Sequence, residues 1–331
     1  MIKAAIIGIA GPVLAVEEAA MLRAGRPAGV ILFARNIVDR GQLRLLVADL
    51  RGVLPAGAVL MVDQEGGRVA RLRPPHWLAH PAAGALGALH EADRAAGLRA
   101  GYLTGALIGL DSGEAGFDVV CAPVLDLRRA GADAVVGDRA YGETAAVVAG
   151  MARAVAAGLL AAGVQPVGKH APGHGRAAVD SHLALPVVRG GDLGADLAPF
   201  AANTDLGWMM TAHILYPAWD AARPATLSPV VIGEIIRGRI GYSGLLVSDD
   251  LAMRALSGTP AERAVAALAA GCDIALYCPG DASGSAAVLE AVPPLTSSAA
   301  TRLAAAAALA RHRRLPLDRA ALLAERSALI P

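Results

Sequence analysis

The chain has 331 residues, 55% of them hydrophobic and 18% charged, a composition that allows a sizeable core and excludes a disordered protein. Its 30 Lys and Arg residues nearly balance 29 Asp and Glu residues, so the formal net charge is +1. No basic field attracts nucleic acid or an anionic membrane, and we expect neither as a partner.

Short apolar runs recur along the chain, and each ends in a polar or Gly-rich cluster. The first resembles a signal peptide, but Gly11-Pro12 interrupts it, so we interpret it as a buried strand. Continuous runs of this length are typical of strands buried on both faces, as in parallel sheets. The predicted strands are Ala4–Ala10, Gly29–Ala34, Ala58–Asp63, Phe117–Leu127, Val164–His170, Trp208–His213, Gly244–Asp249 and Asp273–Cys278.

Segments rich in Ala, Leu and Arg lie between these runs and predict helices. The clearest are Gly41–Val53, Ala92–Gly109, Thr144–Ala162, Ser228–Arg239 and Pro260–Gly271. Residues 279–331 are also Ala-rich, and we expect helices there that close the sheet or pack on it. Eight strands alternating with helices predict a (β/α)8 TIM barrel, built as a single domain from residues 1–331. A doubly wound open sheet is the rival, but Gly8–Pro12 does not supply its usual Gly-rich dinucleotide turn.

The barrel also predicts where a site lies, because such barrels carry their active sites at the C-terminal ends of the strands. Polar clusters occur at six of these ends: Phe33–Asn36, Asp63–Arg68, Asp126, Lys169–His170, His213 and Ser248–Asp250. Neutral turns would be sufficient for stability alone. We therefore expect a functional site at this end of the barrel.

The segment Lys169–Pro186 holds three of the eight histidines, His170, His174 and His182. Its Gly and Pro residues break any helical or strand period, which predicts a loop, and loops on rigid scaffolds often carry catalytic groups. His174 lies between two glycines and either faces a ligand or packs within the loop; the sequence leaves both open.

Asp180 and His182 are separated by one residue, so the carboxylate can bond one imidazole nitrogen. Such a bond fixes the tautomer and leaves the second nitrogen for proton transfer near neutral pH. A structural loop histidine is the alternative, and the neighbouring Lys169 and His170 argue against it.

Asp249 and Asp250 directly follow a predicted buried strand. A carboxylate in this place is desolvated and rigidly held, which suits a nucleophile. One of the pair also fits as a helix N-cap. We attribute the chemistry to Asp249 and a capping or supporting role to Asp250.

Five charged or polar side chains suit the binding of a hydroxyl-rich ligand. An unpaired cation at a barrel mouth is costly without a ligand or partner. Salt bridges among these residues are an alternative that the sequence leaves open. The five residues are Asp63, Arg71, Arg139, Lys169 and His170.

The three cysteines, Cys121, Cys272 and Cys278, each lie in an apolar strand-like run. We predict buried free thiols rather than a disulfide or a metal site. Free thiols favour a reducing compartment.

At these motifs the sequence resembles the β-N-acetylglucosaminidases of glycoside hydrolase family 3, of the single-barrel bacterial type. The motifs, which run from residue 29 to residue 253, are Gly29–Asn36, Asp63–Leu72, Ala122–Leu127, Gly137–Gly142, Lys169–His182 and Val247–Met253. The most specific are Lys169–His182 and the Ser-Asp-Asp at 248–250. One departure is Ala171, where the family usually has Phe.

The resemblance implies a retaining mechanism with Asp249 as the nucleophile. It implies that His182, oriented by Asp180, is the general acid and then the general base, a role that most retaining glycosidases give to a carboxylic acid. It also implies that Asp63, Arg71, Arg139, Lys169 and His170 bind the sugar, without a metal or organic cofactor. His174 and His213 are additional candidates.

The implied substrates are peptidoglycan fragments that carry a terminal N-acetylglucosamine, cleaved in the cytoplasm during cell-wall recycling. We expect a monomer that acts on this small carbohydrate. Three alternatives remain for the reaction: a phosphorylase that uses the same site, a broader β-glycosidase, and a metal-dependent hydrolase using His170, His174, His182 and Asp249. Irregular ligand spacing argues against the metal site. The non-catalytic hypothesis is a sugar-binding barrel that has lost its activity, and the presence of both Asp249 and His182 argues against it.

Overall fold

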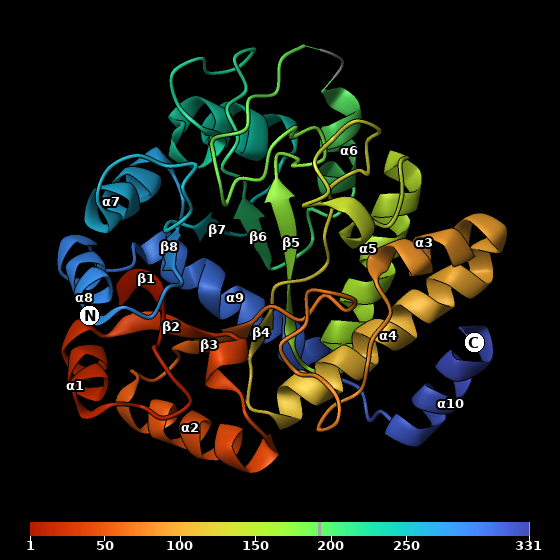
Figure 1. The fold of residues 1–331 in the computed structure, drawn as a ribbon, viewed down its shortest axis with the longest axis horizontal. Coiled ribbons are helices and arrows are strands. Elements are labelled where there is room, and N and C mark those ends of the chain that lie inside the picture. Colours follow the sequence, from red (N-terminus) through yellow and green to blue (C-terminus); the bar gives the residue numbers. More distant parts are fainter. Residues whose placement is uncertain (191–192, 331) are drawn as a thin grey trace.

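A computed structural model describes residues 1–190 and 193–330 and confirms the predicted barrel. Eight parallel strands pair in chain order, and the last pairs with the first to close the sheet (Figure 1). The strands are β1 Lys3–Gly8, β2 Pro27–Leu32, β3 Val59–Val62, β4 Val119–Val120, β5 Gln165–Ala171, β6 Trp208–Thr211, β7 Leu245–Asp250 and β8 Ile274–Tyr277.

Helices surround the barrel and follow its strands in sequence. Short 3₁₀ turns lie at Ala34–Asn36 (η1), Gly137–Arg139 (η2) and Ala225–Leu227 (η3), and a π-helix lies at Val231–Arg239 (η4). The α-helices are α1 Val16–Gly25, α2 Arg40–Val53, α3 Ala83–Ala92, α4 Arg94–Glu114, α5 Ala145–Ala161, α6 Gly194–Ala201, α7 Pro260–Ala270, α8 Ala282–Ala291, α9 Ser297–Arg313 and α10 Arg319–Leu329. None of the helices within residues 1–190 and 193–330 is long and apolar enough to cross a membrane.

The strands read as continuous apolar runs because both of their faces are buried. Successive side chains point to opposite faces, so Ile6 and Met61 fill the barrel interior while Ile7 and Leu60 pack under the helices. The three cysteines are buried and free, as predicted, and Cys121 and Cys278 belong to the interior cluster.

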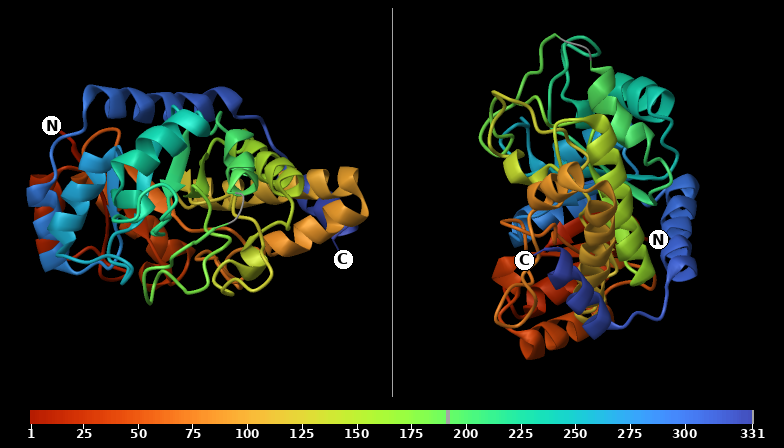
Figure 2. Two further views of the ribbon diagram at one scale, coloured as in Figure 1. Left: turned by 90° about the horizontal axis from the view of Figure 1, so that it is seen from above. Right: turned by 90° about the vertical axis from the view of Figure 1, so that its right-hand side faces the viewer.

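Helix α9 covers one end of the barrel (Figure 2). Its Leu303 and Ala306 join the interior cluster of strand side chains. Gly207 permits this close approach, because a Cβ there would lie 2.8 Å from the Cβ of Ala306. The N-terminal mouth is thus closed by apolar packing, which leaves the opposite mouth for function.

Helix α10 is held on α4 by a buried polar network. Arg326 donates to His80 Nδ1 (2.9 Å), and His80 Nε2 donates to Asp111 (3.2 Å). Arg319 reaches the second oxygen of Asp111 at 2.6 Å. Because arginine offers no acceptor, His80 is neutral and protonated on Nε2. The network fixes the segment that leads into α3.

The structure refines two local predictions. The helix predicted at Ser228–Arg239 is present, and its residues Val231–Arg239 are π-helical. The predicted strand Val164–His170 and the predicted loop Lys169–Pro186 overlapped at Lys169 and His170. Both residues, and Ala171 after them, belong to β5, whose Ala171 pairs with Thr211 of β6. Pairing with β6 keeps these residues in the strand despite the Gly and Pro residues that follow, so the loop begins after Ala171.

Candidate active site

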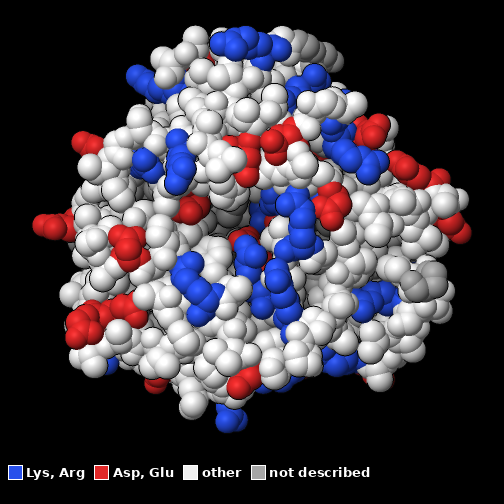
Figure 3. Space-filling view, viewed as in Figure 1, with Lys and Arg blue, Asp and Glu red and all other residues white. Residues whose placement is uncertain are grey.

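A cavity of about 410 Å³ opens at the C-terminal ends of the strands. Lys and Arg side chains gather beside this central hollow (Figure 3). The charged and histidine side chains that line it are Asp63, Glu65, Arg68, Arg71, Arg139, Lys169, His170, His174, Asp180, His182, Asp249 and Asp250. All the sequence-predicted site residues except His213 therefore reach one cavity.

Asp63, at the end of β3, contacts two cations. Its Oδ1 lies 3.0 Å from Lys169 Nζ, and its Oδ2 lies 3.2 Å from Arg71 Nη2. Burial alone raises the pKa of Asp63, but Lys169 and Arg71 outweigh it and hold the pKa far below its usual range. The carboxylate is therefore ionised and held in a fixed orientation.

Glu65 is a member of this network that the sequence reasoning did not single out. It forms two 2.8 Å hydrogen bonds with Arg139 and lies 2.7 Å from Lys169 Nζ. The neighbouring Gly66 has a φ of +98°, and a Cβ there would lie 2.3 Å from the carbonyl oxygen of Pro81. Only glycine fits, so the turn that presents Glu65 is specified by sequence.

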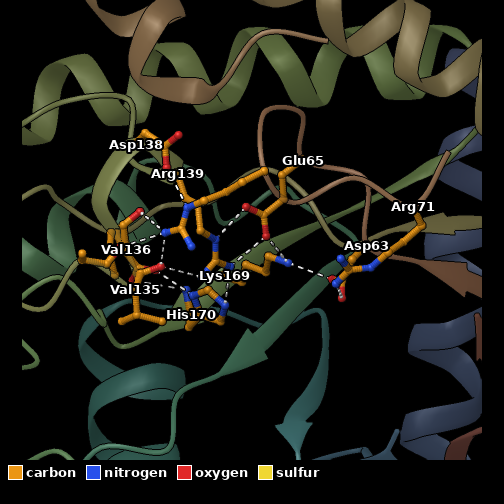
Figure 4. A network of polar contacts seen from close by, with 12 residues as sticks. Asp63, Glu65, Arg71, Val135, Val136, Asp138, Arg139, Lys169 and His170 are labelled. Carbon is orange, nitrogen blue, oxygen red and sulfur yellow. Dashed lines mark hydrogen bonds and ion pairs between the residues drawn. The ribbon is translucent and has the colours of Figure 1, made fainter. Parts of the chain in front are cut away.

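The charges form a chain across the mouth, from Arg139 through Glu65, Lys169 and Asp63 to Arg71 (Figure 4). Burial alone lowers the pKa of Lys169, but the two carboxylates outweigh it and raise the pKa well above its ordinary value. Each of the three cations is thus paired with a carboxylate of the same network. Such salt bridges among the site residues are the alternative that the sequence left open. A ligand here meets fixed charges rather than a free cation.

Asp126, in the segment that follows β4, connects two histidines. Its Oδ2 accepts from His170 Nδ1 at 2.7 Å, and its Oδ1 accepts from the backbone N–H of His174 at 2.6 Å. Arg139 Nη2 lies 3.4 Å from His170 Nε2, so that nitrogen is an acceptor and Nδ1 carries the proton. The imidazole of His170 is thereby held in one tautomer beside the cavity.

Asp249 and Asp250 have different surroundings at the end of β7. Asp250 Oδ1 accepts from the backbone N–H groups of Ala252 and Cys278, both at 3.0 Å, as a capping residue does. Asp249 lines the cavity and is 8% exposed. Burial raises the pKa of Asp249, but the electrostatic effects of His170 and Lys169 and the hydrogen bond from the backbone N–H of Asp250 outweigh it and keep the pKa below its usual range.

His213 supports the β7 end from behind. Its Nε2 donates to the carbonyl oxygen of Asp250 at 2.9 Å, and its Nδ1 lies 2.8 Å from Thr226 Oγ1. It is fully buried and does not line the cavity. Burial lowers the pKa of His213, so the ring is neutral.

Asp180 and His182 lie on the loop that follows β5, at the rim of the cavity. Asp180 Oδ1 accepts from His182 Nδ1 at 2.7 Å and from the backbone N–H of His182 at 2.9 Å. The bond leaves His182 Nε2 for proton exchange with a ligand. The His182 side chain is 58% exposed, whereas that of Asp180 is 27% exposed.

The comparisons with known proteins point to one family. The sequence profile described as "Glycosyl hydrolase family 3 N terminal domain" matches residues 7–311. The chain belongs to glycoside hydrolase family 3. A "Beta-hexosaminidase" of Methylococcus capsulatus is 40% identical over 96% of this chain and 93% of the relative. One from Alkalilimnicola ehrlichii is 43% identical over 82% of this chain and 80% of the relative.

Solved structures share the fold over nearly the whole of this chain. NagZ from Neisseria gonorrhoeae, in complex with N-trifluoroacetyl-D-glucosamine, has a TM-score of 0.88 and 31% identity, covering 99% of this chain and 98% of that chain. A family 3 β-N-acetylglucosaminidase from Paenibacillus has a TM-score of 0.85 and 29% identity, covering 98% of this chain and 67% of that chain.

Three residues of this family 3 site came from the structure rather than from sequence reasoning. Glu65 and Asp126 stood in predicted strand-end clusters, and their place three residues after β3 and six residues after β4 was the available signal. Ser181, which also lines the cavity, gave no signal, because serine is common in loops. Among residues 1–190 and 193–330, no group of three or more His, Cys, Asp or Glu side chains is arranged to hold a metal ion.

Proposed function

We propose that this family 3 glycosidase is a retaining exo-β-N-acetylglucosaminidase that acts through a covalent glycosyl-enzyme. The β-N-acetylglucosaminidase class follows from the "Beta-hexosaminidase" relatives and from the NagZ structures. The observation that carries the mechanism is that Asp249 and the Asp180–His182 pair face the same cavity.

In the first step, a carboxylate oxygen of Asp249 attacks the anomeric carbon and the glycosidic C–O bond breaks. His182 Nε2 gives its proton to the departing oxygen, so the aglycone leaves as an alcohol. Asp180, held ionised, stabilises the imidazole during this exchange. The ionised state of Asp249 is what nucleophilic attack needs.

In the second step, His182 Nε2 takes a proton from water as the water oxygen attacks the anomeric carbon. The bond from that carbon to Asp249 breaks, and the free sugar and the free carboxylate result. One residue thus acts as acid and then as base. His182 thus returns to its initial protonation state after each turnover.

The chain of charges from Arg139 to Arg71 holds the sugar. Carboxylates accept from sugar hydroxyls, whereas Lys169 and Arg139 donate to sugar oxygens. These contacts form in the ground state and persist in the transition state. They therefore contribute chiefly to binding.

The substrates proposed for this site are peptidoglycan fragments with a terminal N-acetylglucosamine, cleaved by a cytoplasmic monomer during cell-wall recycling. The cavity of about 410 Å³ suits a small carbohydrate. Support for the sugar comes from N-trifluoroacetyl-D-glucosamine in the Neisseria structure.

The test compares a chromogenic N-acetyl-β-glucosaminide with the matching glucoside, with and without inorganic phosphate. We expect hydrolysis of the first and little of the second. Equal rates would make the chain a broader β-glycosidase. Formation of a sugar 1-phosphate would make it a phosphorylase.

A second measurement addresses the proton-transfer unit. If Asp180 and His182 act together, removing either lowers kcat/KM nearly as much as removing both. Losses that multiply in the Asp180→Ala/His182→Ala double variant would mean that the two residues act separately.

A further inference from the structure

Ser181 has an unusual place between the two residues of the proton-transfer unit. It is 2% exposed, although the residues on either side, Asp180 and His182, reach solvent. It is the single buried residue between Ala178 and Ala184. A buried polar side chain needs partners, so its contacts show what this part of the loop is attached to.

Ser181 connects two different segments of the site. Its Oγ lies 3.1 Å from His174 Nε2 and 3.8 Å from Met253 Sδ. Its carbonyl oxygen accepts from the backbone N–H of Ala255 at 3.2 Å. Met253 and Ala255 follow Asp249 along the chain, so Ser181 joins the His182 loop to the segment that carries the proposed nucleophile.

His174 is the fixed end of this connection. Its backbone N–H bonds the buried carboxylate of Asp126, and its ring packs edge-on against His170 at 5.7 Å. The next residue, Gly175, lies so close to Leu127 that a Cβ would come within 2.0 Å of its carbonyl oxygen. This half of the loop is therefore packed against the strand ends, and the glycine serves close packing.

We propose that Ser181 and His174 are positioning residues that hold the Asp180–His182 pair at the cavity that Asp249 also lines. His174 Nε2–H donates to Ser181 Oγ, and the Ser181 hydroxyl hydrogen points to Met253. The hydrogen bond fixes the backbone on both sides of Ser181, and hence the direction of His182. The inference rests on the proposed function, because it takes His182 as the acid and base.

The tautomer agrees with this arrangement. Burial lowers the pKa of His174 to about 4, so the ring is neutral near pH 7 and one nitrogen carries its proton. Within residues 1–190 and 193–330, His174 Nδ1 is buried without a hydrogen-bond partner, whereas Nε2 has Ser181. A neutral ring with this geometry is a poor acid, which leaves proton transfer to His182.

The first test is Ser181→Ala, with Ser228→Ala as the matched control. Ser228 is equally buried and bonds Asp220 and Val231, far along the chain from the loop. For each variant, kcat/KM is measured on an N-acetylglucosamine disaccharide and on an aryl glycoside with a good leaving group. General acid catalysis contributes about 10²–10⁴-fold, so misplacing the acid costs the disaccharide reaction about tenfold or more.

The aryl glycoside needs little protonation, so its kcat/KM falls much less in Ser181→Ala. Ser228→Ala lowers both reactions by the same small factor. Adding Ser181→Ala to His182→Ala causes little further loss on the disaccharide, since there is no longer an acid to position. A merely structural role for Ser181 would instead lower both reactions equally and reduce Tm.

The second test separates the two nitrogens of His174. His174→Gln places an amide N–H near the position of Nε2 and retains the wild-type ratio of the two substrates. His174→Asn places its amide near the position of Nδ1. It lowers kcat/KM for the disaccharide more than kcat/KM for the aryl glycoside, as Ser181→Ala does. The opposite order would overturn the proposed hydrogen bond.

The failure of this inference differs from the failure of the proposed function. If His182→Ala lowers kcat/KM equally on both substrates, His182 is not the acid and the proposed mechanism is wrong. If His182→Ala shows the leaving-group dependence and Ser181→Ala does not, the positioning role alone is wrong.

Discussion

Glu65 is the side chain whose replacement most directly tests the charge network. It is 5% exposed and faces both Arg139 and Lys169. Glu65→Gln keeps the shape and one acceptor but removes the charge. Both cations then lie in a buried site with one carboxylate fewer, which is more costly than losing a surface pair.

The magnitude follows from the pKa. Burial alone raises the pKa of Glu65, but Arg139 and Lys169 outweigh it and hold the pKa at about 2, below the ordinary 4.5. A difference of about 2.5 pH units corresponds to about 3 kcal/mol, at about 1.4 kcal/mol for each unit. A loss of this size lowers Tm by about 5 °C in a domain this large.

The assay is thermal unfolding at several pH values, together with KM for the chromogenic substrate. Because the folded-state pKa of Glu65 is lowered, its contribution is present above pH 4.5 and disappears as the pH falls towards about 2. The Tm difference between wild type and Glu65→Gln therefore narrows on acidification. KM rises because Arg139 and Lys169 lose their alignment.

Asp138→Asn is the control. Asp138 pairs with Arg68 at 2.8 Å on the same rim, but both side chains are about half exposed. Such a pair contributes about 0–1 kcal/mol, so Tm changes little. If Glu65→Gln unfolds at the wild-type temperature with an unchanged KM, the reasoning from burial and pairing is refuted.

Three further outcomes are expected. Asp249→Ala removes most activity, and a slowly processed 2-fluoro glycoside labels Asp249 as identified by peptide mass; a label on another carboxylate overturns this role. Arg139→Ala and Lys169→Ala raise KM at least as much as they lower kcat, since each charge-assisted hydrogen bond is worth about 1.5–3 kcal/mol. Wild-type KM values in both variants would exclude these residues from the site. The pKa of His174 is lowered to about 4 in the folded state, so on acidification the unfolded state binds a proton at this residue before the folded state does. The free energy of unfolding, measured with urea, therefore falls as the pH falls from about 6.5 towards 4. His174→Gln removes this part of the pH dependence.

The barrel could be predicted because its signals are local and repeated. Each strand is a short apolar run followed by a polar end, and burial on both faces explains the run. Asp63, Lys169 and Asp249 could be placed at one mouth because parallel strands bring their C-terminal ends together.

Pairing within the site could not be predicted in the same way. Whether Lys169 meets Asp63, Glu65 or a ligand depends on side-chain directions at strands that are far apart in the chain. The burial of Ser181 depends on where the loop after β7 crosses it. These contacts depend on how the loops pack against one another, and a periodic sequence pattern cannot predict them.

The balance of charge in the cavity bears on which acceptor the second step uses. Of the side chains that line it, the cations are Arg68, Arg71, Arg139 and Lys169, and the carboxylates are Asp63, Glu65, Asp180, Asp249 and Asp250. The carboxylates outnumber the cations by one when the histidines are neutral. A neutral sugar and a water molecule enter such a cavity without an electrostatic penalty. A phosphate dianion meets no surplus of positive charge there, and Arg71, Arg139 and Lys169 would each be drawn away from a largely buried carboxylate. The charge balance therefore favours hydrolysis over phosphorolysis, and added phosphate should leave the product a free sugar.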